Sequence, residues 1–170
     1  MLLKHAIDYS GRFVFTSTGM AIEPHNFYGW SKRNAEHIVR NWKNHCIVRL
    51  FNVFGTDPKR RTPPSVADLI VARRLEHIYH PYRRDYIFVD DVVRAIAKTA
   101  VNDVVGTYHL GHGKSYSTTE LIQSFSPGAG METEPLPDHM VEEIIAPEPY
   151  HPDLKLTWAV DDWLRYVSPY

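Results

Sequence analysis

A strand, a helix and a second strand follow one another early in the chain, and this order constrains the fold more than any other feature. Residues Arg12–Ser17 and Cys46–Phe51 are short β-branched and aromatic runs, which predict buried strands. Between them, Asn26–Lys43 places apolar side chains at roughly helical spacing, with Asn26 as the expected cap. A unit of this length predicts two parallel strands joined by a right-handed crossover helix.

The rest of the chain repeats this alternation less regularly. We expect a helix at Ser65–His77, then a strand at Tyr86–Val89, and then a helix capped by Asp90 or Asp91. The apolar stripe of this last helix is Val92, Val93, Ile96, Ala97 and Ala100. A strand at Thr107–Leu110, a helix at Ser117–Phe125 with a Ser117–Glu120 capping box, edge strands around Met140–Ile145 and a last helix at Asp161–Val167 complete the expected order. The pattern predicts an α/β protein whose parallel sheet continues into a smaller mixed lobe.

Charge and hydropathy exclude several classes of function. Nineteen basic and twenty acidic residues give a formal net charge of −1, so no overall field draws the chain to nucleic acid or to anionic lipid. No stretch approaches the ~20 apolar residues of a membrane span. Lys4, His5 and Asp8 interrupt the region where a secretory signal needs an apolar run, and the single Cys46 has no disulfide partner in the chain. We expect a cytoplasmic protein with no membrane or nucleic-acid partner.

The strongest local candidate for chemistry is Tyr28-Gly29-Trp30-Ser31-Lys32. Side chains four residues apart share one face of a helix, so Tyr28 and Lys32 are expected to be neighbours. A nearby ammonium favours the phenolate of a tyrosine and suits it to general acid/base catalysis. The alternative is an aromatic side chain packed on the helix beside a solvated lysine.

Hydroxyl groups precede this helix, because Thr16, Ser17 and Thr18 lie where the first strand is expected to end. Open α/β sheets bind ligands at the carboxyl ends of their strands. A hydroxyl there can hydrogen-bond a reacting alcohol or carbonyl while Tyr28 moves the proton. The simpler alternative is a strand end whose hydroxyls satisfy local backbone groups.

The histidines suggest metal pairs that the rest of the sequence does not complete. His77 with His80, and His109 with His112, lack a carboxylate or cysteine partner at ligand spacing. We therefore expect no metal site.

Taken together, these segments resemble a family: the extended short-chain dehydrogenase/reductases, the NAD-dependent nucleotide-sugar epimerases and dehydratases. FVFTSTG is similar to the strand that bears the family's catalytic Ser/Thr, and FYGWSK to its Tyr-x-x-x-Lys helix. Arg49–Gly55 resembles the Arg-x-x-Asn-Val-Tyr-Gly turn, and Arg84–Asp91 the Arg-Asp-Phe-x-x-Val-x-Asp segment. The fold implied is the C-terminal part of a doubly wound, Rossmann-like domain with a smaller mixed substrate-binding lobe.

The resemblance implies roles for individual residues. Tyr28 is implied as the acid/base, Lys32 as the residue that holds the nicotinamide ribose, and Thr18 as the group that binds the sugar hydroxyl. Cofactor-binding residues would be Lys32, Tyr28 and Ser17, with NAD or NADP as cofactor. Substrate-binding residues would be Asn52, Arg84 and Asp90, where the family contacts the nucleotide sugar. The implied division is a Rossmann remnant with the Tyr/Lys helix at residues 1–55 and a substrate-binding lobe at 56–170, interleaved with the last Rossmann elements.

Two departures from the family keep a second hypothesis open. The family's N-terminal Gly-x-x-Gly-x-x-Gly motif is absent, and only a short loop separates Thr18 from Tyr28. The leading hypothesis is an NAD(P)-dependent enzyme that moves hydride at a sugar carbon. The alternative is a truncated, non-enzymatic remnant or subunit that binds nucleotide sugar but cannot hold the dinucleotide unaided. The resemblance also implies a homodimer in which Asn26–Lys43 and Met1–Tyr9 of each copy pack into a four-helix bundle. A variant of the second hypothesis is a separate, complementing chain that carries the missing strands.

Overall fold

The computed structural model describes residues 11–54, 82–102, 104–117, 120, 142–144 and 146–147. Its elements are β1 (Phe13–Thr18), the 3-10 helix η1 (Gly19–Ala21), α2 (Phe27–Val39), β2 (His45–Leu50), β3 (Asn52–Phe54), β4 (Tyr82–Phe88), α4 (Val89–Val101), β5 (Gly106–Leu110), β6 (Ser115–Ser117) and β7 (Glu142–Ile144). The helices expected at Ser65–His77 and Asp161–Val167 lie outside the described residues.

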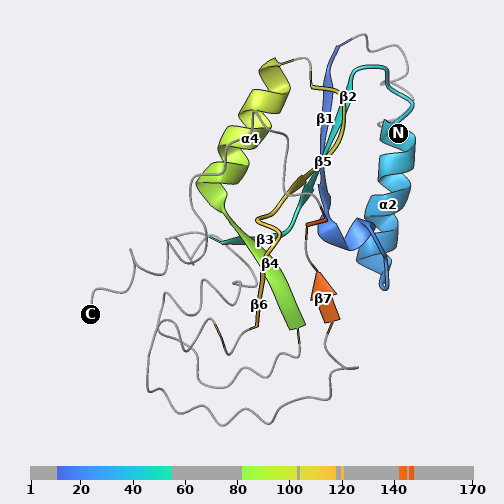
Figure 1. The fold of residues 1–170 in the computed structure, drawn as a ribbon. Helices are drawn as coiled ribbons and strands as arrows, with labels where there is room; N and C mark the ends of the chain where they lie inside the picture. The colour runs from blue at the N-terminus through green and yellow to red at the C-terminus, as the bar shows by residue number, and fades with distance from the viewer. Residues whose placement is uncertain are drawn as a thin grey trace.

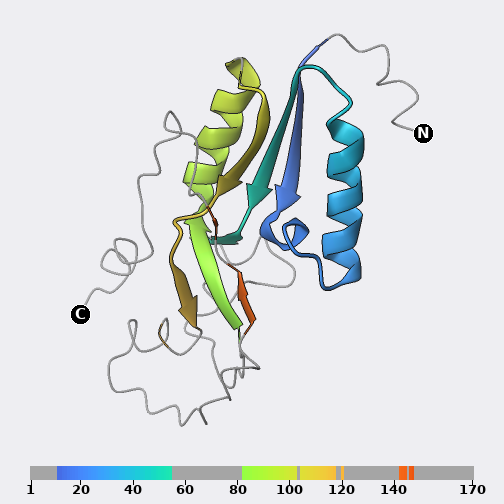
Figure 2. The ribbon, with the colours of Figure 1, turned by 45° about the vertical axis from the view of Figure 1, so that its right-hand side comes forward.

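Three parallel strands form the central sheet in the order β1-β2-β5. Helix α2 connects β1 to β2, as the first strand–helix–strand segment predicts. Figures 1 and 2 show α2 on one side of this sheet and α4 on the other, so the sheet is the middle of three layers. The expectation of an α/β fold with a parallel sheet is confirmed.

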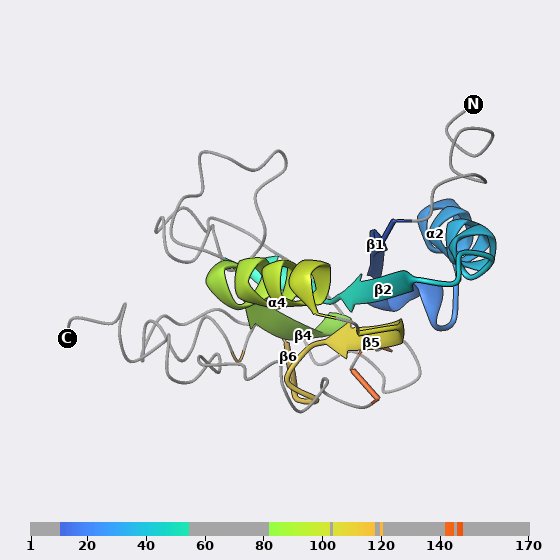
Figure 3. The same ribbon diagram turned by 90° about the horizontal axis from the view of Figure 1, so that it is seen from above.

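The remaining strands form a smaller mixed sheet around β4. Strand β4 pairs in parallel with β3 and β7 and antiparallel with β6. It then runs directly into α4, which lies beside β4 in Figure 3, while α2 lies beside β1 at the other side of the molecule. The expected mixed lobe is therefore present, and β4 joins it to the α4 layer.

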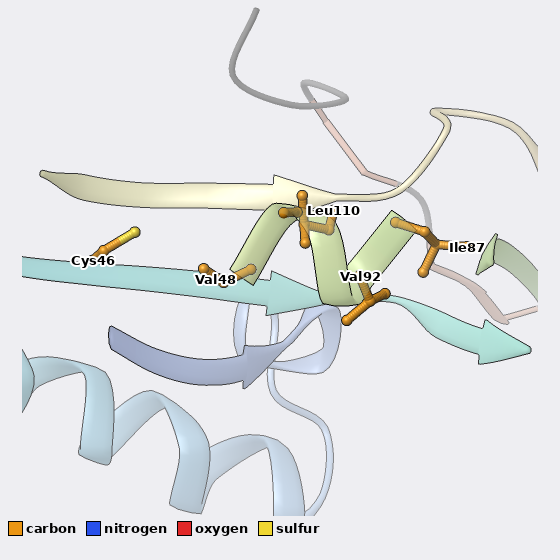
Figure 4. Packing of buried hydrophobic residues seen from close by; sticks show 6 residues of the cluster. Cys46, Val48, Ile87, Val92 and Leu110 are labelled. Atoms are coloured by element: carbon orange, nitrogen blue, oxygen red, sulfur yellow. The ribbon is translucent and has the colours of Figure 1, made fainter. Parts of the chain in front are cut away.

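The main hydrophobic core lies between the parallel sheet and α4. Its buried members are Cys46, Val48, Ile87, Val92, Ala95 and Leu110, most of which are labelled in Figure 4. Successive side chains of a strand point to opposite faces, so Cys46 and Val48 face α4 while Ile47 and Arg49 face α2. Burial raises the pKa of the Cys46 thiol, which makes this cysteine a poor nucleophile.

The start and the buried face of α4 differ from the sequence-based expectation. The helix begins at Val89 after an N-cap at Phe88, so the prediction that Asp90 or Asp91 caps it is wrong. Both carboxylates instead lie in the first turn, where the helix dipole favours negative charge. No described helix is long and apolar enough to span a bilayer.

The predicted apolar stripe of α4 is only partly correct. Val92 is buried, but Val93 is 60% exposed and Ala97 and Ala100 are also exposed in the described structure. The buried face carries Thr99, whose hydroxyl donates to the Ile96 carbonyl at 2.8 Å. A polar residue whose hydrogen bond is satisfied locally can occupy a core position, which hydrophobic spacing alone does not reveal.

Candidate functional site

Two local caps shape the turn between the first strand and its helix. The Thr18 side-chain oxygen accepts a hydrogen bond from the Met20 N–H at 3.3 Å and begins η1. The Asn26 carboxamide oxygen accepts from the Gly29 N–H at 2.9 Å and begins α2, as the sequence predicts. The chain therefore turns sharply after Thr18 and presents the first turn of α2, with Tyr28, beyond the end of β1.

Lys32 lies between β1 and Tyr28. Its ammonium donates to the Thr16 carbonyl at 3.1 Å and lies 5.1 Å from the centroid of the Phe15 ring. The same nitrogen lies 6.0 Å from the centroid of the Tyr28 ring, and Tyr28 is 50% exposed. The structure thus brings Tyr28 and Lys32 together near the carboxyl end of β1, with the phenol accessible to a ligand.

Helix α2 is held tightly against the turn that precedes it. One guanidinium nitrogen of Arg33 donates to the carbonyls of Ala21 and Ile22, both at 2.8 Å. A Cβ atom on Gly29 would lie 2.8 Å from the Met20 carbonyl oxygen, so a side chain at this position would push the helix away. The glycine next to Tyr28 therefore has a packing reason that the sequence alone does not show.

A buried ionic network on the α2 face of the sheet was missed by the sequence-based reasoning. The Glu36 carboxylate is fully buried and accepts hydrogen bonds from Arg49 at 2.9 and 2.7 Å and from Ser17 Oγ at 2.6 Å. Arg40 adds an ion pair at 3.0 Å from the more exposed side. One available signal was Arg49 itself, since an arginine in a strand buried on both faces needs a carboxylate partner.

The ionisation of Glu36 depends on this network. Burial by itself raises the pKa of a carboxyl group, but hydrogen bonds from Arg49 and Ser17 and the charges of Arg49 and Arg40 outweigh it. The pKa of Glu36 consequently lies below its usual value. Ser17, expected as a cofactor-binding residue, is buried and donates its hydroxyl to Glu36.

The expected substrate-binding residues lie on other elements. Asn52 is on β3 and hydrogen-bonds the side chain of its strand partner Tyr86, whose pKa is raised by burial. Arg84 is on β4, where its guanidinium donates to the Arg83 carbonyl at 3.1 Å. Asp90 is exposed in the first turn of α4. Asn52 pairs with the end of β4 that precedes α4, whereas Arg84 pairs with Tyr116 of β6 and Ile144 of β7, so the three residues are spread along β4 and the first turn of α4.

A second buried carboxylate joins separate segments of the mixed lobe. Asp85 is fully buried and accepts backbone hydrogen bonds from His112 and Gly113 at 2.8 Å and from Ala146 at 3.2 Å. Burial raises its pKa, and these three hydrogen bonds offset the effect only in part. A Cβ atom on Gly111 would lie 2.5 Å from one Asp85 oxygen, so the turn after β5 approaches this carboxylate as closely as a glycine allows.

Comparison with solved structures places this arrangement in a known fold. A UDP-glucose 4-epimerase from Thermotoga maritima, solved with UDP-glucose, superposes with a TM-score of 0.71 at 23% identity, covering 98% of this chain and 65% of that one. A dTDP-glucose 4,6-dehydratase from Bacillus anthracis, solved with NAD, superposes with a TM-score of 0.70 at 16% identity, covering 98% and 64%. At these identities the likeness shows the fold, and the chain spans about two thirds of each solved protein.

Sequence comparison gives the family. A UDP-glucose 4-epimerase from Bacillus subtilis is 30% identical over 138 residues, which cover 63% of this chain and 40% of the relative. The sequence model of the "NAD dependent epimerase/dehydratase family" matches residues 10–111. That match includes Thr18, Tyr28, Lys32 and the Glu36–Arg49 pair. The chain therefore belongs to the NAD-dependent epimerase/dehydratase family.

Proposed function

We propose that this chain carries the proton-transfer and sugar-binding part of a nucleotide-sugar epimerase or dehydratase, with Tyr28 as acid/base. The observation that carries the proposal is the position of the Lys32 ammonium, between the Thr16 carbonyl and the Tyr28 ring. The Lys32 ammonium, 6.0 Å from the centroid of the Tyr28 ring, therefore places a charged hydrogen-bond donor beside the phenol. Tyr28 is half-exposed, so a substrate hydroxyl can reach the phenol and exchange a proton with it.

The neighbouring groups have hydrogen-bonding capacity left for a ligand. An ammonium has three donors, and the Thr16 carbonyl takes one of those on Lys32, which leaves donors for ribose hydroxyls. Thr18 Oγ1 accepts from the Met20 N–H, so its own O–H is available to orient a sugar hydroxyl or carbonyl. Together these residues would bind the sugar and move its proton.

Lys32 and Tyr28 are the part of this site that fits a nicotinamide dinucleotide. When bound, NAD or NADP supplies the hydride acceptor and donor for a sugar carbon. Lys32 and Tyr28 suit the nicotinamide ribose because they offer exposed donors beside the end of a parallel strand. The glycine-rich turn that commonly holds a pyrophosphate is absent from the sequence, so these residues are proposed for the ribose alone.

The nucleotide sugar is assigned to the lobe around β3 and β4. Asn52, Arg84 and Asp90 are proposed as its contacts, with residues 56–170 contributing most of that lobe and residues 1–55 the proton-transfer groups. A planar guanidinium such as that of Arg84 can bind two phosphate oxygens at once. The Thermotoga maritima epimerase of the same fold was solved with UDP-glucose.

The second candidate function is a non-enzymatic remnant or subunit that binds nucleotide sugar but not dinucleotide unaided. The position of β1 at the edge of the central sheet favours this candidate, because β1 pairs with β2 alone in the described part of the chain. The open edge of β1 could accept a further strand from a complementing chain. This candidate differs from the first in predicting UDP-sugar binding without NAD binding.

Turnover and binding measurements separate the two candidates. We expect the protein, given NAD and a panel of UDP-, GDP- and dTDP-sugars, to convert at least one sugar, and Tyr28→Phe to lower kcat about 100-fold or more. Tyr108→Phe is the matched control, because it removes a phenol that donates to the Val105 carbonyl away from β1 and α2. Absence of turnover together with unchanged ligand binding in Tyr28→Phe would refute the enzymatic proposal. Micromolar NAD affinity by calorimetry would refute the second candidate.

The outer surface of α2 supports a proposed homodimer. Phe27 is 88% exposed, Trp30 54% and Ile38 38%, and side chains at this spacing fall on one face of a helix. Exposed aromatic and aliphatic side chains gathered on one helix face are typical of an interface between protein chains. A cytoplasmic location remains part of the proposal.

A further inference from the structure

The Glu36 network contacts all three strands and the helix that surround the proposed proton-transfer site. Glu36 lies on α2, two helical turns after Tyr28 and one after Lys32. It binds Ser17 on β1 and Arg49 on β2, and the second terminal nitrogen of Arg49 lies 3.2 Å from His109 Nε2 on β5. One carboxylate thereby links α2 to the ends of the neighbouring strands.

Stability alone is a poor explanation for such a network. Replacing a buried ion pair by apolar residues of similar volume is often neutral or stabilising, because desolvating two charges offsets their attraction. What hydrogen bonds provide, and apolar contacts do not, is a fixed direction and distance. Glu36 uses both oxygens in this way, one for Ser17 and Arg49 Nε and the other for Arg49 Nη2 and Arg40.

The residue that Glu36 holds on β1 is the immediate neighbour of the proposed sugar-binding residue. Ser17 precedes Thr18, and the next residues form η1, which α2 contacts through Arg33. Thr18 and Tyr28 come from different elements, so the distance between their hydroxyls depends on how α2 sits against the end of β1. The exposed contact from Lys32 to Thr16 is a weaker constraint, since the proposed function also requires Lys32 to bind a ribose.

We propose that Glu36 is a positioning residue for proton transfer: through Ser17 and Arg49 it fixes the end of β1 against α2 and so sets Thr18 relative to Tyr28. This inference rests on the proposed function. Displacing a catalytic group by about 1 Å through a distant substitution can lower a rate about 100-fold. Loss of this link should therefore reduce the chemical step more than substrate binding.

Ser17→Ala is the decisive variant, because it removes one hydroxyl and leaves the Glu36–Arg49 ion pair in place. We expect kcat to fall about 10- to 100-fold, while KM for the nucleotide sugar changes less than about threefold. Ser17→Thr restores the hydroxyl and should recover most of kcat. Glu36→Gln combined with Ser17→Ala should be little worse than the more damaged single variant, because the two residues act as one unit.

Arg40→Gln is the matched control. It removes a contact to Glu36 from the exposed side without touching Ser17, and kcat should stay within about twofold of the parent protein. If the parent turns over and Tyr28→Phe is inactive, but Ser17→Ala keeps parental kcat, the positioning role is refuted while the proposed function stands. A fall in kcat that Ser17→Thr does not recover would also refute it. If the parent itself shows no turnover, the proposed function fails instead.

Discussion

Arg49 and Glu36 form a two-point ion pair inside the protein, with Nε and Nη2 of the arginine 2.9 and 2.7 Å from the two carboxylate oxygens. The pair joins β2 to α2, and the Glu36 side chain has no exposed surface. Since the arginine belongs to the strand and the glutamate to the crossover helix, the pair fixes how the helix lies on the sheet.

Removing one member of this pair should be far more damaging than removing both. Arg49→Met leaves the Glu36 charge buried without its main partner, and we expect it to lower the free energy of unfolding by about 3–5 kcal/mol. Glu36→Met combined with Arg49→Met leaves no buried charge and should be clearly more stable than Arg49→Met alone. Urea denaturation of the three proteins measures the difference. A double variant less stable than Arg49→Met would contradict this account.

Acid should weaken the contribution of Glu36 to stability. Its pKa in the folded protein lies below the usual value of 4.5, so the folded state binds this proton less readily than the unfolded chain. The contribution is fully present above that value and is lost as the pH falls through the folded pKa. We expect the stability difference between the parent and Glu36→Gln to be constant near pH about 7 and to shrink below pH about 4.5. A difference that grows on acidification would contradict the assigned pKa direction.

Asp85→Asn tests the carboxylate that joins three segments of the mixed lobe. The amide NH₂ of asparagine replaces one acceptor oxygen and meets a backbone N–H donor from His112, Gly113 or Ala146. A buried donor left without an acceptor costs about 1–3 kcal/mol, so the free energy of unfolding should fall by this amount. Hydrogen exchange should also show faster exchange of the His112 and Gly113 amides. Unchanged exchange at both amides would contradict the conclusion that the Asp85 carboxylate holds these segments together.

Gly29→Ala should reduce both stability and activity, although alanine is the better helix former. The added Cβ would lie 2.8 Å from the Met20 carbonyl and 3.1 Å from Pro24 Cβ, so α2 must move away from the preceding turn. Overpacking of this kind costs about 1–3 kcal/mol. Val93→Ala, at an exposed position of α4, is the control and should change neither property. Equal behaviour of the two variants in thermal unfolding and turnover would contradict the close-approach explanation.

Trp30→Glu tests the proposed dimer. A charge placed among Phe27, Trp30 and Ile38 cannot be buried against a second copy without a partner, so sedimentation should shift from dimer to monomer. Ala100→Glu adds the same charge to the exposed surface of α4 and should leave the association state unchanged. A parent protein that stays monomeric at high concentration would refute the dimer.

Features that depend on a few neighbouring residues were predicted well from the sequence. The Asn26 cap was correct, and the Ser117–Glu120 capping box is present, with reciprocal hydrogen bonds of 2.7 and 3.1 Å between the two residues. The first strand–helix–strand segment was also correct, because hydrophobic periodicity and cap residues are local signals. The α4 cap was wrong for a related reason: two acidic residues in the first turn resemble a cap in sequence, yet the N-cap is Phe88, two residues before Asp90.

Features that depend on distant residues could not be read from the chain. Arg49 and Asp85 both lie within strands. No residue near them in the sequence indicates that Glu36 is the partner of Arg49, or that the amides of His112 and Ala146 are partners of Asp85. The apolar stripe of α4 was only partly correct because the spacing of apolar residues does not fix which side of the helix is buried, and packing against β1, β2 and β4 decides it.

The sequence by itself determined the parallel α/β fold, the Tyr28–Lys32 pair on one helical face and the hydroxyls at the end of β1. These follow from the fixed geometry of a helix and a strand. The tertiary structure alone decided that Ser17 binds Glu36, that Arg49 neutralises this carboxylate, and that Asp85 gathers amides from two other segments. A buried charge must find hydrogen-bonding partners wherever the folded chain brings them, and that place is set by packing rather than by sequence distance.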